Sequence, residues 1–231
     1  MEKYAVIVAG GSGSRMGGGM PKQFRSLSGR PMLWWSLRSF HEENPSTQLI
    51  VVLPEDFISL WKDFFQTLPD FDRFEHKIAC GGATRTESVI NGLKLIDDPE
   101  SLVAVHDGAR PLVSASIIRK GWEMARESGA AIPVVAVSDS LRELTGEKDS
   151  RNVDRGKFRA VQTPQIFLTS VLKNAYSRTM GQTFTDDASA VESTGIKVIL
   201  FEGSPDNIKV TTPKDMLLAQ LMIENTNCHD A

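Results

Sequence analysis

The sequence is poor in the residues that form metal centres and disulfide scaffolds. Its 231 residues include only two cysteines, Cys80 and Cys228, which lie far apart, and four histidines. Neither residue type shows the short, regular spacing of a metal-ligand set. We therefore expect no zinc site held by the protein, and we expect reduced thiols in a cytoplasmic protein.

Long apolar runs and an excess of positive charge are missing as well. No stretch approaches the ~20 consecutive apolar residues of a transmembrane helix. The first apolar run, residues 5–9, is too short for a signal peptide and is better explained as a strand. The formal net charge is −3, whereas nucleic-acid-binding proteins usually carry a basic patch. The composition therefore argues against a membrane or a nucleic acid as the partner.

What the sequence does contain is a regular alternation of short apolar runs and amphipathic stretches. Continuous runs of valine, isoleucine and leucine are typical of strands that are covered on both faces, as in a parallel sheet. Such strands are expected at residues 4–9, 48–53, 102–106, 131–137 and 197–201. Helix-start signals lie between them, at Pro31, at Thr84 to Glu87 and at Thr212 to Asp215. The alternation predicts a single α/β domain over residues 1–231, with a doubly wound, mostly parallel, Rossmann-like sheet.

The polar segment 138–162 interrupts this alternation. It has a turn signal at Thr145-Gly146-Glu147 between two short stretches. This pattern predicts a β-hairpin arm that projects from the sheet. An arm that buries little by itself commonly packs on a partner subunit, so we expect a homodimer formed through it. A mobile surface loop is the alternative interpretation.

The segment after the first strand is rich in glycine. Six glycines fall within residues 10–19, and Arg15 and Lys22 add positive charge. Glycine lets the backbone approach a ligand closely and turn its N–H groups toward an anion, so a polyphosphate is the expected ligand. The dinucleotide fingerprint fails because Met16 stands where glycine is needed, which argues against a dehydrogenase. A P-loop is excluded because Gln23 follows Lys22.

A flexible linker is the alternative for this segment. Its position directly after a buried strand argues against a linker, because ligands of open α/β sheets bind at the carboxyl ends of strands. The string Gly-Gly-x-Gly-x-Arg-Met, followed by Pro-Lys-Gln, resembles the signature loop of the sugar-phosphate nucleotidyltransferases. Within them it is most similar to the cytidylyltransferases that act on 2-C-methyl-D-erythritol 4-phosphate, and later motifs match in order over roughly residues 5–220.

The resemblance implies a reaction and a set of nucleotide-side residues. CMP is transferred from CTP to 2-C-methyl-D-erythritol 4-phosphate, a sugar-alcohol phosphate, and pyrophosphate is released on the non-mevalonate route to isoprenoids. Arg15, Lys22 and Lys209 are the expected catalytic cations. Asp107 ends a buried strand beside the expected triphosphate site, so it suits Mg²⁺ or another divalent cation and the ribose. The expected nucleotide-binding residues are Ala9, Gly10, Gly11, Gly13, Gly82, Ser88 and Asp107.

The resemblance also implies the residues that bind the second substrate, namely Arg110, Ser140, Arg155, Thr163 and Thr185. In the family, the arginine matched by Arg155 reaches into the neighbouring subunit's site. Thr185 is further expected to cap a helix and offer its hydroxyl to a phosphate. His106 is expected to be structural. The sequence departs from the family pattern at Gly10, Ala83 and Ser140.

The attacking group of this reaction is already an anion near neutral pH, so no strong general base is needed. The chemical requirement is a positive field that brings two anions together and stabilises the charge of the transition state. Two rivals remain open. A ribitol 5-phosphate cytidylyltransferase shares the start of the glycine-rich loop, and a non-catalytic nucleotide sensor could use the same fold.

Overall fold

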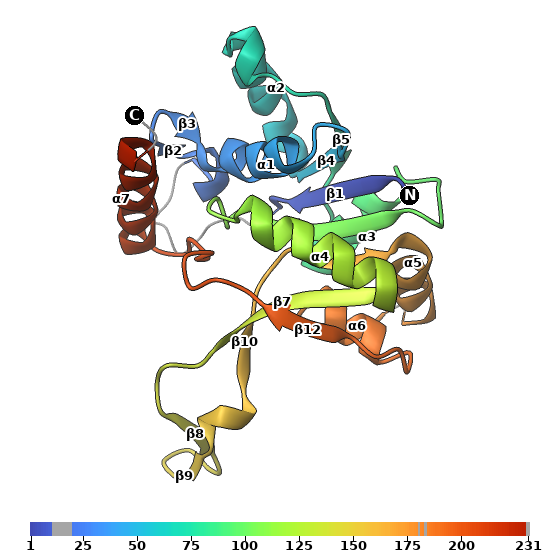
Figure 1. The fold of residues 1–231 in the computed structure, drawn as a ribbon, viewed down its shortest axis with the longest axis vertical. Coiled ribbons are helices and arrows are strands. Elements are labelled where there is room, and N and C mark those ends of the chain that lie inside the picture. The colour runs from blue at the N-terminus through green and yellow to red at the C-terminus, as the bar shows by residue number, and fades with distance from the viewer. Residues whose placement is uncertain (11–19, 180, 183, 230–231) are drawn as a thin grey trace.

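The computed structural model describes residues 1–10, 20–179, 181–182 and 184–229, with side chains through Asn225. Its central feature is an eight-stranded sheet (Figure 1). The strands of this sheet are β1 (Lys3–Val8), β4 (Gln48–Leu53), β5 (His76–Cys80), β6 (Leu102–Asp107), β7 (Ala130–Ala136), β10 (Arg159–Val161), β11 (Gln165–Leu168) and β12 (Ile199–Glu202). The five strands predicted from apolar runs are confirmed, each within two or three residues of its predicted bounds.

Most neighbours in the sheet are parallel. β6, β1, β4 and β5 pair in parallel in that order, and β12 pairs in parallel with β7. β11 lies antiparallel between β6 and β7, and β10 is antiparallel to β7. β10 and β11 both lie along β7, and only residues 162–164 separate them. They therefore form one interrupted antiparallel run. These two strands were not predicted.

Helices cover both faces of the sheet, as the doubly wound prediction requires. Alternate residues of β1 show this: Ala5 and Ile7 pack into one core, and Tyr4 and Val6 into the other. The first core contains residues of α1 (Met32–Glu43), α2 (Ile58–Thr67) and α4 (Ala115–Ser128). The second contains residues of α3 (Arg85–Leu93), α5 (Thr169–Arg178) and α6 (Asp187–Glu192).

The last helix, α7 (Pro213–His229), packs beside the small hairpin formed by β2 (Ser26–Leu27) and β3 (Arg30–Pro31). The Thr212 hydroxyl accepts a hydrogen bond from the Asp215 N–H, and the Asp215 carboxylate accepts one from the Thr212 N–H. The predicted start of this helix is therefore confirmed. Among the described helices, none is long and apolar enough to cross a membrane.

Three other helix starts were also predicted. Pro31 directly precedes α1, which begins at Met32. The capping box of Thr84 and Glu87 is present at the start of α3. The prediction that Thr185 caps a helix was wrong, because Asp186 caps α6 and forms a reciprocal pair with Ser189. In a capping box, the cap exchanges hydrogen bonds with the residue three positions later. For Asp186 that residue is Ser189, which can return a hydrogen bond. For Thr185 it would be Ala188, which has no polar side-chain atom.

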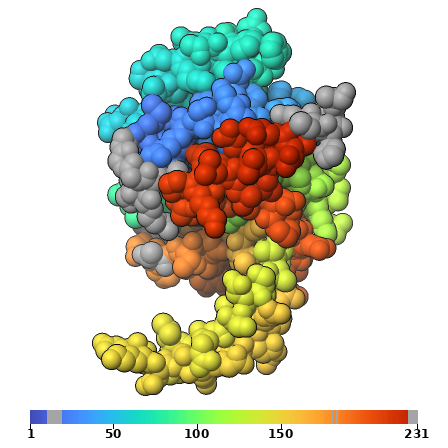
Figure 2. All heavy atoms as spheres, turned by 90° about the vertical axis from the view of Figure 1, so that its left-hand side faces the viewer, coloured from blue at the N-terminus to red at the C-terminus, as the bar shows by residue number. Residues whose placement is uncertain are grey.

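The predicted arm exists as the hairpin of β8 (Leu141–Leu144) and β9 (Ser150–Val153), which projects from the sheet (Figure 1). Figure 2 shows the arm, in yellow, leaving the lower end of the body and extending sideways. A 3-10 turn, η5 (Arg155–Lys157), follows the hairpin. The arm ends earlier than predicted, because residues 159–161 form β10 in the main sheet.

Candidate active site

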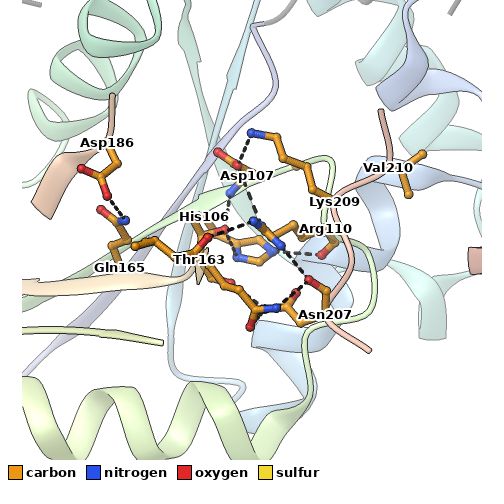
Figure 3. A network of polar contacts seen from close by, with 12 residues as sticks. His106, Asp107, Arg110, Thr163, Gln165, Asp186, Asn207, Lys209 and Val210 are labelled. Carbon is orange, nitrogen blue, oxygen red and sulfur yellow. Dashed lines mark hydrogen bonds and ion pairs between the residues drawn. The ribbon is translucent and has the colours of Figure 1, made fainter. Parts of the chain in front are cut away.

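Asp107, the last residue of β6, is surrounded by cations from three other places in the chain. Its Oδ2 atom lies 2.7 Å from Lys209 Nζ and 4.0 Å from Arg110 Nε, and its Oδ1 atom lies 3.4 Å from Arg85 Nε. We call Asp107, Arg85, Arg110 and Lys209 the Asp107 cluster. Figure 3 shows Lys209 and Arg110 beside the carboxylate.

The neighbouring cations stabilise the negative charge of Asp107. Burial by itself raises the pKa of the Asp107 carboxyl, but the charges of Arg85 and Lys209 lower it more. Its pKa therefore lies well below the ordinary value, and the carboxylate is ionised across the physiological range. Burial lowers the pKa of the Arg110 guanidinium, and Asp107 offsets part of that shift.

A chain of hydrogen bonds beneath Asp107 fixes its backbone. The Asp107 N–H donates to the Thr163 hydroxyl over 3.0 Å, and Thr163 lies 3.1 Å from His106 Nδ1. His106 Nε2 lies 3.0 Å from the Arg110 carbonyl, which can only accept, so Nε2 carries the proton and Nδ1 accepts from Thr163. His106 is fully buried, and burial lowers its pKa to about 4. This neutral histidine supports the strand end, in agreement with its expected structural role.

The segment after β12 is bound to the same place. The buried amide of Asn207 donates to the Thr163 carbonyl over 2.8 Å, and Arg110 Nη1 donates to the Asn207 carbonyl over 2.6 Å. Gln162 donates to the Ser204 carbonyl over 2.8 Å. These bonds fix residues 204–207 and thereby bring Lys209 to Asp107 (Figure 3).

Lys22 joins this group from the N-terminal part of the chain. It begins the 3-10 turn η2 (Lys22–Phe24), and its Nζ donates to the Val210 carbonyl over 2.8 Å. The Val210 N–H in turn donates to the Ala109 carbonyl over 2.8 Å. Lys22 is therefore bound to the segment that carries Lys209. The predicted residues Gly11, Gly13 and Arg15 lie outside the described residues.

A second group of predicted residues meets at the ends of β1 and β5. Ser88 is buried; its hydroxyl accepts from the Gly82 N–H over 3.1 Å and donates to the Thr84 carbonyl over 2.9 Å. A Cβ atom on Gly10 would lie 3.1 Å from Ser88 Oγ, so the two loops approach each other closely.

The backbone of Ala9 is partly engaged within the chain. Its N–H donates to the Val52 carbonyl over 2.9 Å, and its carbonyl accepts from Gln23 Nε2 over 2.6 Å. Only the second lone pair of that carbonyl remains for a base. The Ala9 N–H is therefore not available to a nucleotide.

The substrate-side residues are divided among three places. Arg110 and Thr163 belong to the buried surroundings of Asp107, where both make hydrogen bonds within the chain. Ser140 and Arg155 are exposed on the arm, and Arg155 donates to the Ser138 carbonyl. In the described part of the chain, no hydrogen bond or ion pair joins residues 141–157 to the Asp107 cluster. Thr185 is exposed just before α6.

Sequence reasoning missed Arg85 and its partners. Arg85 Nη2 lies 2.7 Å from Asp187 Oδ2, and the hydroxyl of Tyr176 donates to the other oxygen of Asp187. A signal was available, because Arg85 follows the cap Thr84 in a loop already singled out. That loop was interpreted through its capping box, its glycines and Ser88.

The cluster can supply one ligand to a divalent cation. Asp107, which pairs with Lys209, is the only carboxylate of the Asp107 cluster. In the described ranges, no group of three or more histidine, cysteine, aspartate or glutamate residues could hold a metal. Magnesium is commonly held by one or two carboxylates together with substrate phosphates and water. The residues therefore fit a magnesium ion carried by a nucleotide, with Asp107 as the protein ligand.

Comparison with known proteins agrees over nearly the whole chain. The family described as 2-C-methyl-D-erythritol 4-phosphate cytidylyltransferase matches residues 4–225. A protein of that name from Bacteroides thetaiotaomicron is 44% identical over 225 residues, which is 96% of this chain and 100% of that protein. One from Phocaeicola vulgatus is 43% identical over 223 residues, with 96% and 100% covered.

A solved structure is similar over the same length. The crystal structure of 2-C-methyl-D-erythritol 4-phosphate cytidylyltransferase from Thermus thermophilus superposes with a TM-score of 0.77 at 36% identity. The similarity covers 96% of this chain and 98% of that one.

Proposed function

Because this chain belongs to the 2-C-methyl-D-erythritol 4-phosphate cytidylyltransferase family, we propose that it transfers CMP from CTP to 2-C-methyl-D-erythritol 4-phosphate. The products are 4-diphosphocytidyl-2-C-methyl-D-erythritol and pyrophosphate, and the step belongs to the non-mevalonate isoprenoid pathway. The observation that carries the proposal for the site is the ion pair of Lys209 with Asp107 at the carboxyl end of β6, on a segment whose next residue, Val210, is hydrogen-bonded to Lys22.

The reaction is an in-line displacement at phosphorus. A phosphate oxygen of the sugar-alcohol phosphate forms a bond to the α-phosphorus of CTP, the bond to the bridging α–β oxygen breaks, and pyrophosphate leaves with that electron pair. No proton has to be removed from the nucleophile. Lys22, Lys209 and Arg15 supply positive charge where negative charge builds up, which is the largest need of such a transition state.

The buried surroundings of Asp107 support this role for Lys209. The ion pair over 2.7 Å holds an otherwise mobile, 45% exposed lysine side chain in one place. Holding a charge in position before the reaction avoids reorganisation during it. Ser88 and the glycines beside it are proposed to bind the base, and Arg110 and Thr163 to hold the segments that contact the second substrate.

Magnesium is the proposed cofactor, with Asp107 as its protein ligand. When bound, the ion neutralises charge on the CTP phosphates. Asp107 suits this role because its pKa is lowered by the cations around it, so that the carboxylate is ionised across the physiological range. The same carboxylate is proposed to contact the ribose.

The arm supports the proposal of a homodimer. Leu144 near its tip is 80% exposed, and Arg155 has no link to the cluster of its own chain within the described residues. An arm with these features is suited to a neighbouring subunit, where Arg155 and Ser140 would contact the sugar-alcohol phosphate. The proposed setting is the cytoplasm, with small molecules as substrates and neither nucleic acid nor membrane as a partner.

The test is pyrophosphate release with CTP and Mg²⁺, with methylerythritol phosphate and ribitol 5-phosphate compared at equal concentrations. We expect turnover with methylerythritol phosphate. Turnover with ribitol 5-phosphate alone would keep the CTP chemistry and overturn the pathway. Binding of CTP without release in either mixture would favour a nucleotide sensor.

A further inference from the structure

Arg85 connects two carboxylates that belong to different halves of the proposed site. Its Nε lies 3.4 Å from Asp107 Oδ1, and its Nη2 lies 2.7 Å from Asp187 Oδ2. Asp107 ends β6 beside Lys209, whereas Asp187 opens α6 directly after Thr185 and Asp186. We propose that Arg85 is a positioning residue for the transfer reaction, which holds the Asp107 carboxylate against Lys209 and fixes the start of α6. This inference rests on the proposed function and adds a residue to it.

The backbone of Arg85 is itself held firmly. It is the first residue of α3, directly after the cap Thr84. The Glu87 carboxylate accepts hydrogen bonds from the N–H groups of Ala83, over 2.6 Å, and Thr84, over 3.4 Å. The same loop carries Gly82, which donates to Ser88. Arg85 therefore starts from the loop proposed to bind the base, and its side chain reaches the two other segments.

Asp187 gives the guanidinium a fixed point. Asp187 is fully buried, with Tyr176 on one oxygen and Arg85 on the other. A buried carboxylate without a partner is strongly unfavourable, so the pair with Arg85 is retained in the folded protein. The guanidinium is planar, and a group fixed at one nitrogen by Asp187 has little freedom at the nitrogen that faces Asp107.

The consequence for Lys209 follows from the two oxygens of Asp107. Arg85 contacts Oδ1, and Lys209 contacts Oδ2. With Arg85 in place the carboxylate plane is set, so Lys209 is presented in one direction. Without it, the carboxylate can rotate between Lys209 and Arg110, and the catalytic lysine loses its fixed position. A lysine at position 85 carries one compact charge and cannot make both contacts with the same geometry.

A purely structural role would look different. In that case Arg85 only neutralises the buried charge of Asp187, and removing both charges together restores the enzyme. The decisive variant is therefore the double substitution Arg85→Gln with Asp187→Asn, compared with Arg85→Gln and Arg85→Lys. Arg126→Gln, an exposed arginine on α4, is the matched control. Thermal unfolding and steady-state kinetics with CTP and methylerythritol phosphate are measured for each.

We expect Arg85→Gln to lower both the melting temperature and kcat, the latter by ~10²-fold, as is typical when a reacting group is displaced. The double variant should regain most of the melting temperature and keep the loss of kcat, with the KM for CTP changed by less than about threefold, because the base-binding contacts remain. Arg85→Lys should keep most of the stability without recovering kcat. Arg126→Gln should match the wild type.

Recovery of wild-type kcat in the double variant would show that Arg85 acts on stability alone and would overturn the proposal. Wild-type kcat in folded Arg85→Gln would do the same. The wild-type enzyme in the same assay separates this inference from its premise. If the wild type turns over and the variants behave as a structural role requires, the positioning role fails and the proposed function stands. A wild type without turnover overturns both.

Discussion

The Asp107 cluster and the arm use arginine in opposite ways. Arg85 and Arg110 are largely buried and bind groups that come from distant parts of the chain. On the arm, Arg142 donates to Ser150 over 2.7 Å and Arg151 to Glu143 over 2.6 Å, both within the same exposed hairpin. One region is thus organised by a single folded chain before any ligand arrives. The other is held by hydrogen bonds within its own hairpin.

The largest effect is expected when a cation is removed from the surroundings that the folded chain organises around Lys209. We expect Lys22→Ala to lower turnover by ~10²–10³-fold, because one preorganised charge contact with the transition state is lost. Pyrophosphate release and circular dichroism measure activity and folding together. The matched control is Lys62→Ala, an exposed lysine on α2. Equal turnover of folded Lys22→Ala and the control would remove Lys22 from the mechanism.

The second prediction uses the buried histidine beneath the cluster. The folded-state pKa of His106 is about 4, below the ordinary 6.5, because the buried ring resists protonation. Below pH 6.5 the unfolded chain gains a proton that the folded chain does not take up, so stability falls with falling pH. Between pH 6.5 and 4.5 this contribution amounts to about 2 kcal/mol.

Urea unfolding at several pH values measures this loss. His106→Gln keeps a donor and an acceptor but cannot titrate, so its free energy of unfolding should fall less steeply than that of the wild type. His76, whose pKa is also lowered by burial, contributes equally to both proteins. Parallel curves for the two proteins would contradict the assignment of this pH dependence to His106.

The third prediction tests the arm. We expect Arg155→Ala to raise the KM for the sugar-alcohol phosphate by about tenfold or more, because a hydrogen bond to a charged group is lost. The KM for CTP should stay near the wild-type value. Arg151→Ala, another exposed arm arginine, is the matched control because its partner Glu143 lies on the same hairpin. A larger effect on CTP than on the sugar-alcohol phosphate would contradict the placement of Arg155.

Mixing two impaired variants, at a sugar-alcohol phosphate concentration below the wild-type KM, extends this test to the partner subunit. A dimer of one Lys22→Ala chain and one Arg155→Ala chain has one complete site if the arm acts on the neighbouring chain. Random reassociation of a symmetric dimer would then restore up to about a quarter of wild-type turnover. If Arg155 acts within its own chain, no mixed dimer has a complete site, and activity stays at the level of the separate variants.

The smallest effect is expected within the hairpin. Glu143 and Arg151 have side chains that are 49% and 69% exposed. An ion pair so open to water contributes little, and Glu143→Gln should change the free energy of unfolding by less than about 0.5 kcal/mol. A loss several times larger would mean that the arm is coupled to the body, and the contrast between the two regions would disappear.

Sequence reasoning was most successful where one apolar pattern determines the element. β1 and β4 have short continuous apolar runs rich in valine and isoleucine, which are typical of a strand buried on both faces. β11 has three buried residues among four but enters the sheet antiparallel, between two strands that run the other way. Its direction depends on the course of the chain through the arm and residues 162–164. No local pattern contains that information.

The candidate site divides in the same manner. Lys22, Asp107 and Lys209 could be selected because each stands in a recognisable motif, and the structure brings the segments of all three together. The loop of Arg85 was noticed, but its role could not be predicted from the sequence, because that role depends on Asp187, which lies 102 positions along the chain. Long-range ion pairs of this kind follow from the fold and are visible only once it is known.

Three contacts of the site involve residues 207–210, and this determines when the site can form during synthesis of the chain. They join Lys22 to Val210, Asp107 to Lys209 and Arg110 to Asn207. Chains emerge from the ribosome with the N-terminal end first. The strands from β1 to β11 can therefore be complete before residues 207–210 are available to any of these contacts. A chain that stops short of Asn207 includes the residues of those strands and lacks Lys209 altogether. The contacts that complete the proposed site can thus form only after residue 210 has been synthesised.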